Sequence, residues 1–133
     1  MNVFVDTSAL LAVLDADDAN HQAAGPFWEK IVAGGDTLVS HNYILVETSA
    51  LVARKLGLEA LRVFETDIVP LLRVVWVTRD IHESAAGAQL LASRRSLSLV
   101  DCVSFEVMRR TGIRGAFTFD RHFQEYGHEI LPS

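Results

Sequence analysis

The chain has 133 residues, a length typical of one domain with a sizeable core, and half of these residues are hydrophobic. No apolar run approaches the roughly 18 residues that span a bilayer, and the N-terminus lacks the basic segment of a signal peptide. With a single cysteine and no expected membrane contact, the chain is expected to be cytoplasmic. The net charge of −5 argues against a broad nucleic-acid-binding face, although residues 94–133 carry six arginines against five acids.

Hydrophobic periodicity predicts strands that alternate with helices along the chain. In chain order we expect strand 2–5, helices 7–15 and 19–35, strand 37–40, helices 42–57 and 58–72, strand 74–77, helices 80–95 and 99–112, strand 115–119, helix 120–127 and strand 128–132. The second helix is expected to bend or restart at Gly25–Pro26, and the third to be capped by Asn42 and stopped by Gly57. This alternation predicts a single α/β domain over residues 1–133, with a mostly parallel central sheet flanked by helices.

Two aspartates follow predicted strands, which is where α/β folds place their ligand sites. Asp6 comes directly after residues 2–5, and Asp120 follows residues 115–119 in the same way. Each can also cap the helix that begins beside it, because an aspartate oxygen accepts hydrogen bonds from the first free N–H groups. A structural and a functional interpretation are therefore both open for these two residues.

Two further acids lie early in predicted helices. Asp101 stands three residues after Ser98, a spacing typical of a capping box. Glu47 has only uncharged residues three and four positions away on its helix, so no salt-bridge partner lies within local reach. A favourable charge near a helix N-terminus is one interpretation. The other is a specific partner elsewhere, which a carboxylate among apolar neighbours usually has.

All four acids can converge at one edge of the sheet, where their mutual repulsion would require a cation. Two carboxylates about 4 Å apart repel by roughly 4 kcal/mol at an effective dielectric constant near 20. Oxygen ligands favour hard ions such as Mg²⁺ or Mn²⁺ over zinc. Because such an ion activates water and neutralises phosphate charge, the pattern predicts metal-assisted phosphoryl hydrolysis. The predicted ligands are Asp6, Glu47, Asp101 and Asp120.

Four segments in order, VDTSALL, ILVETSAL, SLVDCVSFEVMRR and FTFDRHF, resemble the motifs of PIN domains and look most like those of the VapC toxins. The resemblance covers essentially the whole chain and implies a Mg²⁺- or Mn²⁺-dependent ribonuclease fold. It implies an acidic pocket formed by Asp6, Glu47, Asp101 and Asp120. Thr118 matches the hydroxyl residue of the family's T-x-D element.

The resemblance also implies an endoribonuclease that acts as the toxin of a type II toxin–antitoxin pair. A cognate antitoxin would cover the pocket, and the chain would form a homodimer. Two alternatives from other classes stay open: a non-catalytic RNA- or protein-binding module, which would function without metal, and a structure-specific DNA nuclease, which would prefer DNA to single-stranded RNA. If water is the nucleophile, the products carry 5′-phosphate and 3′-hydroxyl ends.

The histidines and arginines support weaker predictions. The five histidines show no ligand spacing in the sequence, which argues against zinc. His122 lies two residues after Asp120 and could contact the substrate, but a solvated or capping role is the favoured interpretation of its ring. Arg94, Arg95 and Arg121 are hypothetical contacts for an RNA backbone, because arginine forks suit phosphate oxygens.

Overall fold

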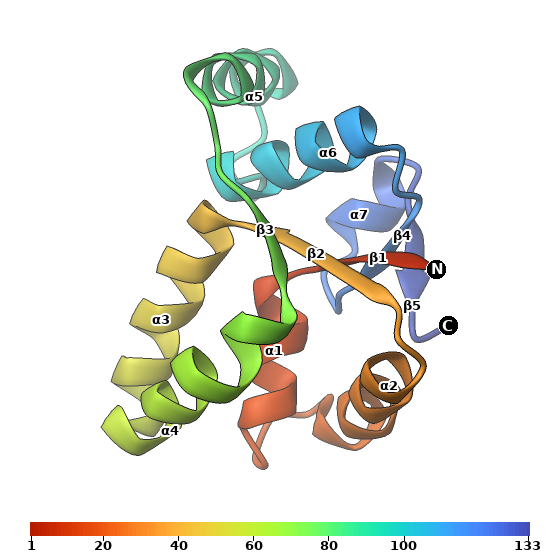
Figure 1. The fold of residues 1–133 in the computed structure, drawn as a ribbon. Coiled ribbons are helices and arrows are strands. Elements are labelled where there is room, and N and C mark those ends of the chain that lie inside the picture. The colour runs from red at the N-terminus through yellow and green to blue at the C-terminus, as the bar shows by residue number, and fades with distance from the viewer.

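A five-stranded parallel sheet runs through the middle of the computed structural model, which describes residues 1–133 (Figure 1). Its strands are β1 (Asn2–Val5), β2 (Thr37–His41), β3 (Arg73–Val75), β4 (Gly115–Phe117) and β5 (Glu129–Leu131). Their order is β3-β2-β1-β4-β5, and every neighbouring pair is parallel. The α/β fold and parallel sheet expected from the sequence are confirmed, with β1 at the centre.

Helices cover both faces of this sheet (Figure 1). One face carries α1 (Thr7–Leu14), α2 (His21–Ala33), α3 (Asn42–Leu56) and α4 (Leu58–Val63), and the other carries α5 (Arg79–Ala92), α6 (Leu99–Thr111) and α7 (His122–Glu125). The chain moves outward from β1 to β3 and then returns to β4 and β5 on the other side of β1. Because crossovers between parallel strands are right-handed, this reversal places the later helices on the opposite face.

Two local expectations differ from the structure. Helix α2 is continuous from His21 to Ala33 and does not restart at Gly25–Pro26, because Pro26 lies early in the helix and removes only one backbone hydrogen bond. The predicted Asn42 cap of α3 is wrong. His41 is the cap, and its Nδ1 accepts a hydrogen bond from the Ile44 N–H over 3.3 Å. Asn42 instead accepts one from the Val77 N–H over 2.6 Å, which ties the start of α3 to the segment after β3.

Most remaining boundaries lie within a few residues of the expected ones, although β3 and β4 end two residues earlier than predicted. Gly57 ends α3 as predicted, with a φ of 93° that side-chain-bearing residues rarely adopt. The helical stretch after it changes character before β3, with a π-helical turn at Phe64–Ile68 and a 3₁₀ turn at Val69–Leu71. No helix in the structure is both long enough and apolar enough to cross a membrane.

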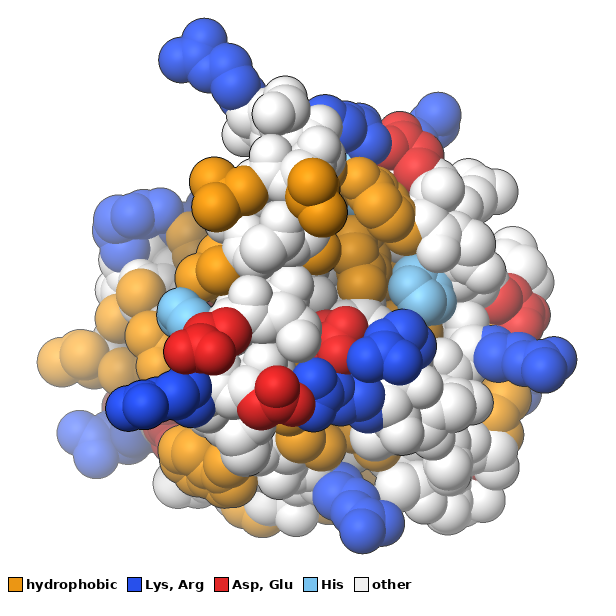
Figure 2. All heavy atoms as spheres, turned by 90° about the horizontal axis from the view of Figure 1, so that it is seen from above, with side chains coloured by type: hydrophobic (Ala, Val, Ile, Leu, Met, Phe, Trp, Pro, Cys, Tyr) orange, Lys and Arg blue, Asp and Glu red, His pale blue; other side chains and the backbone are white.

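Helix α5 lies on α6 at the outside of the molecule, and much of its surface is uncovered (Figures 1 and 2). One ion pair joins the two helices, because Arg110 of α6 lies 2.6 Å from Asp80 of α5, and Arg110 also lies 2.7 Å from Glu106 of its own helix. Figure 2 shows hydrophobic side chains beside a group of acidic and basic side chains on this side of the molecule. Leu90 and Leu91 near the end of α5 are 78% and 88% exposed. This face therefore presents apolar surface that the chain itself does not bury.

Candidate metal centre

A pocket of about 410 Å³ lies beyond the carboxyl ends of β1 and β4 and at the starts of α1 and α6. Its wall contains all four acids that the sequence singles out, together with serine, threonine and leucine side chains; the full set is Asp6, Thr7, Ser8, Leu11, Glu47, Leu51, Ser96, Ser98, Asp101 and Asp120. No lysine or arginine lines the pocket, and none forms an ion pair with these four carboxylates. The fold thus concentrates negative charge without supplying a positive side chain to balance it.

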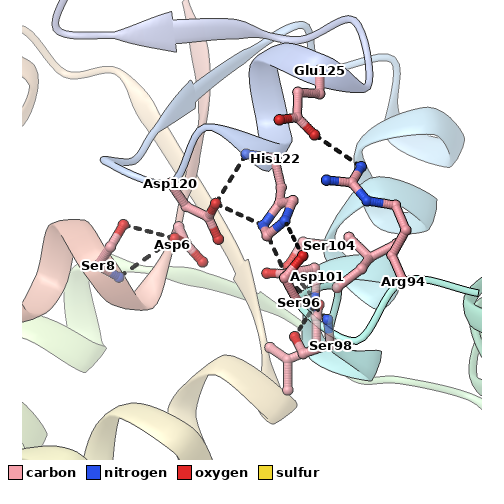
Figure 3. Close-up of polar contacts among 12 residues, drawn as sticks. Asp6, Ser8, Arg94, Ser96, Ser98, Asp101, Ser104, Asp120, His122 and Glu125 are labelled. Carbon is pink, nitrogen blue, oxygen red and sulfur yellow. Dashed lines mark hydrogen bonds and ion pairs between the residues drawn. The ribbon is translucent and has the colours of Figure 1, made fainter.

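Asp6 both caps a helix and lines the pocket, so its two interpretations are compatible. It follows β1 directly and is almost fully buried. Its Oδ2 atom accepts hydrogen bonds from the Ser8 N–H over 3.4 Å, from the Ser8 hydroxyl over 2.8 Å and from the Thr118 hydroxyl over 2.9 Å (Figure 3 shows the Ser8 contacts). All three donors converge on one oxygen, which leaves Oδ1 available to a ligand.

The electrostatics of the pocket disfavour an ionised Asp6 in the absence of a cation. Burial raises the pKa of Asp6 from 3.8 to about 6, and the nearby charges of Asp101 and Asp120 act in the same direction. Hydrogen bonds from Ser8 and Thr118 oppose this rise but do not cancel it. A bound divalent ion would favour the charged form, so the carboxylate and the ion would stabilise each other.

Thr118 connects the end of β4 to the two strand-end acids. It is fully buried and lies immediately after β4, which ends at Phe117 rather than at the expected Phe119. Its hydroxyl donates to Asp6 and accepts a hydrogen bond from the Asp120 N–H over 3.0 Å. Because the strand ends early, the Phe119 N–H is not part of the sheet and donates to the Ser8 hydroxyl over 2.9 Å. The T-x-D segment is thereby fixed against the start of α1.

Asp101 lies in the first turn of α6, and the predicted capping box is confirmed. The Ser98 hydroxyl accepts a hydrogen bond from the Asp101 N–H over 3.0 Å, and Asp101 Oδ2 accepts one from the Ser98 N–H over 3.1 Å. Burial, with a contribution from the charge of Asp120, raises the pKa of Asp101. The cap thus holds the carboxylate beside a second acid.

His122 occupies a position that the sequence did not predict (Figure 3). Its backbone N–H donates to Asp120 Oδ1 over 2.9 Å, while its ring Nδ1 lies 2.9 Å from the same oxygen and 3.8 Å from Asp101 Oδ2. The expected solvated or capping role is wrong for the ring, since the side chain is only 16% exposed and neither ring nitrogen forms a hydrogen bond to the backbone. Sequence spacing alone could not reveal this group, because Asp101 comes from α6 and Asp120 and His122 come from the segment after β4.

Glu47 lines the pocket from α3 but stands apart from this group. The ligand atoms of Asp101, Asp120 and His122 all lie within 4.8 Å of one another, and neither Glu47 nor Asp6 belongs to that set. Glu47 is half-buried and forms no hydrogen bond or ion pair with another side chain. Glu47 therefore has no partner among the protein's own side chains. Its carboxylate is available to a ligand bound in the acidic pocket.

The donors in the pocket fit a divalent cation. Carboxylate oxygens are the preferred ligands of Mg²⁺ and Mn²⁺. In addition, His122 Nδ1 is buried and has no hydrogen-bond partner, although it faces two carboxylates. A buried polar atom in that state is costly unless another group binds it. Asp6, Glu47, Asp101 and Asp120 are the residues available to hold an ion here.

The arginines near the pocket have different environments. Arg94 forms an ion pair with Glu125 of α7 over 2.9 Å (Figure 3), which anchors the segment between α5 and α6. Arg95 and Arg121 are exposed and have no ion-pair partner. Of the three arginines expected to contact a phosphate backbone, these two have their guanidinium groups free.

Comparison with known proteins gives a consistent result. A family model for the PIN domain matches residues 3–129. Over 132 residues the chain is 34% identical to the 23S rRNA-specific endonuclease VapC20 of Mycobacterium tuberculosis, with 98% of each protein covered. The crystal structure of VapC20 from that organism, described as a sarcin–ricin loop cleaving toxin, matches with a TM-score of 0.85 over 95% of both chains at 34% identity.

A more distant structure shares the fold alone. FitAcB from Neisseria gonorrhoeae matches with a TM-score of 0.69 over 98% of this chain and 96% of the other, at 14% identity. The family match and the similarity to VapC20 both extend over nearly the whole chain, and they show that it belongs to the PIN-domain nucleases of the VapC type.

Proposed function

We propose that the chain is a divalent-metal-dependent endoribonuclease that hydrolyses RNA phosphodiester bonds with Mg²⁺ or Mn²⁺. One observation supports this most strongly: four carboxylates line a single pocket that contains no basic side chain. In a PIN-domain nuclease, such a pocket suits a cation and a phosphate that the cation binds. We assign Asp6, Glu47, Asp101 and Asp120 as the metal ligands.

The side chains around these acids would act by orienting them. A bound ion supplies a nucleophilic water near neutral pH and neutralises charge on the phosphate. Ser8 and Thr118 fix one oxygen of Asp6, and the Ser98 capping box fixes Asp101. The N-termini of α1 and α6 border the same pocket, and the positive ends of their helix dipoles would favour a bound phosphate.

We propose 23S rRNA as the substrate, because the chain is 34% identical over almost its full length to a relative named for that specificity. We also propose that the chain acts in the cytoplasm, where ribosomal RNA is found. With water as nucleophile, each cut leaves a 5′-phosphate and a 3′-hydroxyl. A 2′,3′-cyclic phosphate end would contradict this mechanism, since it requires the ribose hydroxyl to attack instead.

Cleavage by the purified, partner-free chain tests this proposal. The substrates are ribosomal RNA and a single-stranded DNA of matching sequence, each with Mg²⁺, with Mn²⁺ and with chelator. We expect RNA cleavage that needs metal, disappears in Asp6→Asn and persists in Asp15→Asn. Asp15 is a matched control because it is also a buried aspartate in a cap of α1, where it accepts a hydrogen bond from the Asp17 N–H. Cutting in chelator, or equal cutting by Asp6→Asn, would refute the metal centre, and preferential cutting of DNA would refute the substrate.

We further propose that the chain is the toxin of a type II toxin–antitoxin pair, that a cognate antitoxin covers the pocket, and that the active form is a homodimer. The similarity to VapC20 supports the toxin assignment. The exposed leucines of α5 support burial against a second copy. Light scattering should give twice the chain mass for the wild type and the single mass for Leu91→Glu. A monomeric wild type would refute the dimer.

A further inference from the structure

The ring of His122 lies between two acids that the proposed centre already uses. Its Nδ1 faces Asp120 Oδ1 at 2.9 Å and Asp101 Oδ2 at 3.8 Å, and this nitrogen is buried. Its Nε2 lies 3.3 Å from the Ser96 hydroxyl (Figure 3). One ring nitrogen therefore contacts a hydroxyl, and the other lies beside two carboxylates.

A hydrogen on Nδ1 does not explain this arrangement. At 2.9 Å, a ring N–H that pointed at Asp120 Oδ1 would form a hydrogen bond, yet the contact does not have hydrogen-bond alignment. When the hydrogen is on Nε2, the ring donates to Ser96, and the Nδ1 lone pair is buried beside two carboxylate oxygens without pointing directly at the nearer one. Those three groups repel one another unless a positive charge lies among them. A metal ion meets that need, because each group then directs a lone pair at the ion.

We propose that His122 Nδ1 is a nitrogen ligand of the metal ion held by Asp101 and Asp120, and that it makes this ion position favour Mn²⁺ over Mg²⁺. The inference rests on the proposed function, because it adds a ligand to the same centre. Mg²⁺ strongly prefers oxygen donors and keeps several of its waters. Imidazole suits first-row transition ions better, so one nitrogen donor shifts the preference toward Mn²⁺.

The surroundings of the ring are suited to this role. A metal-bound histidine usually donates its other ring N–H to a nearby acceptor, which fixes the tautomer and the orientation of the ring. Ser96 provides that acceptor from the segment between α5 and α6. The ion pair between Arg94 and Glu125 ties that segment to α7, the helix that begins with His122. Ser96 is therefore a positioning residue for the proposed ligand.

Pulsed EPR of the Mn²⁺-loaded chain tests the ligand directly, without reference to RNA cleavage. We expect ¹⁴N modulation from a coordinated imidazole, its loss in His122→Asn and its retention in His21→Asn. His21 is a matched control because it is half-buried and its Nδ1 contacts the carbonyl of Ala12, away from the acids. Incorporation of ¹⁵N-histidine into the wild-type chain should replace the ¹⁴N signal with a ¹⁵N coupling. This second measurement needs no mutation and is independent of how the variants fold.

Metal competition gives a second readout. The ratio of Mn²⁺ to Mg²⁺ affinity should fall roughly tenfold in His122→Asn and less in Ser96→Ala, because the latter keeps the imidazole and removes only the hydroxyl that orients it. Bound Mn²⁺ without nitrogen modulation would overturn the inference and leave the four-acid centre in place. Nitrogen modulation that persists in His122→Asn would overturn the assignment to this residue. If Mn²⁺ does not bind at all, the inference fails, while the Mg²⁺ and chelator arms of the RNA cleavage assay decide the metal-dependent function separately.

Discussion

The Thr118 hydroxyl donates a hydrogen bond to Asp6 Oδ2 over 2.9 Å and thereby joins residues 112 positions apart in the sequence. The interaction exists because β1 and β4 are neighbours and both strands end at the same edge of the sheet. It also links Asp6 to Asp120, whose N–H donates to the same hydroxyl. A single buried hydroxyl thus sets the relative position of two proposed metal ligands.

Thr118→Val should therefore weaken both the fold and metal binding. The change leaves the Asp120 N–H without its acceptor and removes a donor from Asp6, at a cost of about 1–3 kcal/mol. Thr118→Ser keeps the hydroxyl and serves as the control. Urea unfolding in chelator measures the first effect, and Mn²⁺ titration measures the second. A Thr118→Val chain that matches the wild type in both measurements would show that the hydroxyl is dispensable.

The raised pKa of Asp6 predicts an unusual pH dependence of stability in the metal-free protein. Because the folded-state pKa of about 6 lies above the unfolded value of 3.8, the native state binds more protons between these limits. The Asp6 contribution to the free energy of unfolding should fall as pH rises from about 4 to about 6, by up to roughly 3 kcal/mol. The difference between wild type and Asp6→Asn in chelator isolates this contribution. Parallel pH profiles of the two proteins would contradict it.

We expect His41 to have the opposite effect on the pH dependence of stability. Its Nδ1 accepts from the Ile44 N–H, so the ring hydrogen is on Nε2 and points to the Ser104 hydroxyl at 2.9 Å. Burial lowers the pKa of His41 from 6.5 to about 3. The native state thus excludes a proton that the unfolded chain binds, and stability should fall as pH decreases from 6.5 toward 3, by up to roughly 1.4 kcal/mol per pH unit.

His41→Asn tests this prediction, because asparagine can also cap α3 but does not titrate. The acid-side slope of the variant should be shallower than that of the wild type in urea unfolding at a series of pH values. An unchanged slope would mean that other groups account for the loss of stability in acid.

The two free arginines beside the pocket should contribute to RNA affinity in a salt-dependent way. If each guanidinium binds one phosphate, Arg95→Ala and Arg121→Ala should each reduce the slope of log affinity against log salt by about 0.7. Binding is best measured in the Asp6→Asn background, where cleavage is not expected. Arg73→Ala is the control, since Arg73 begins β3 at the other end of the sheet. Unchanged slopes for both variants would remove these residues from the RNA interface.

The sequence predicted much of this molecule because many of its signals are local. Strand 2–5 followed by Asp6, and the Ser98–Asp101 capping box, are patterns of a few neighbouring residues, and the structure contains both. Strand order is different, because it depends on which apolar faces meet across the whole chain. The positions of the four acids at strand ends and helix starts indicated that they could converge at one edge of the sheet, and the resemblance to a known family implied that they form one pocket.

Two errors have a common physical cause. His41 and Asn42 are adjacent polar residues at the start of α3, and a hydrogen bond from distant Val77 determines which of them is free to cap. His122 is oriented by Ser96, which comes from the segment between α5 and α6, 26 positions earlier in the chain. In both cases a tertiary interaction selects between two side-chain roles that the local sequence permits equally.

Three of the four acids accept backbone hydrogen bonds at the starts of α1, α6 and α7. Each therefore has a structural role besides the proposed metal binding, and this affects which inactivating mutations the fold can tolerate. Asparagine is as good a helix cap as aspartate, and one nucleotide change converts an aspartate codon into an asparagine codon. Such a substitution at Asp6, Asp101 or Asp120 would remove a charge that the proposed ion needs while it keeps the oxygen that the helix needs. Inactivated descendants of this chain should therefore survive as folded proteins that still bind RNA or a partner.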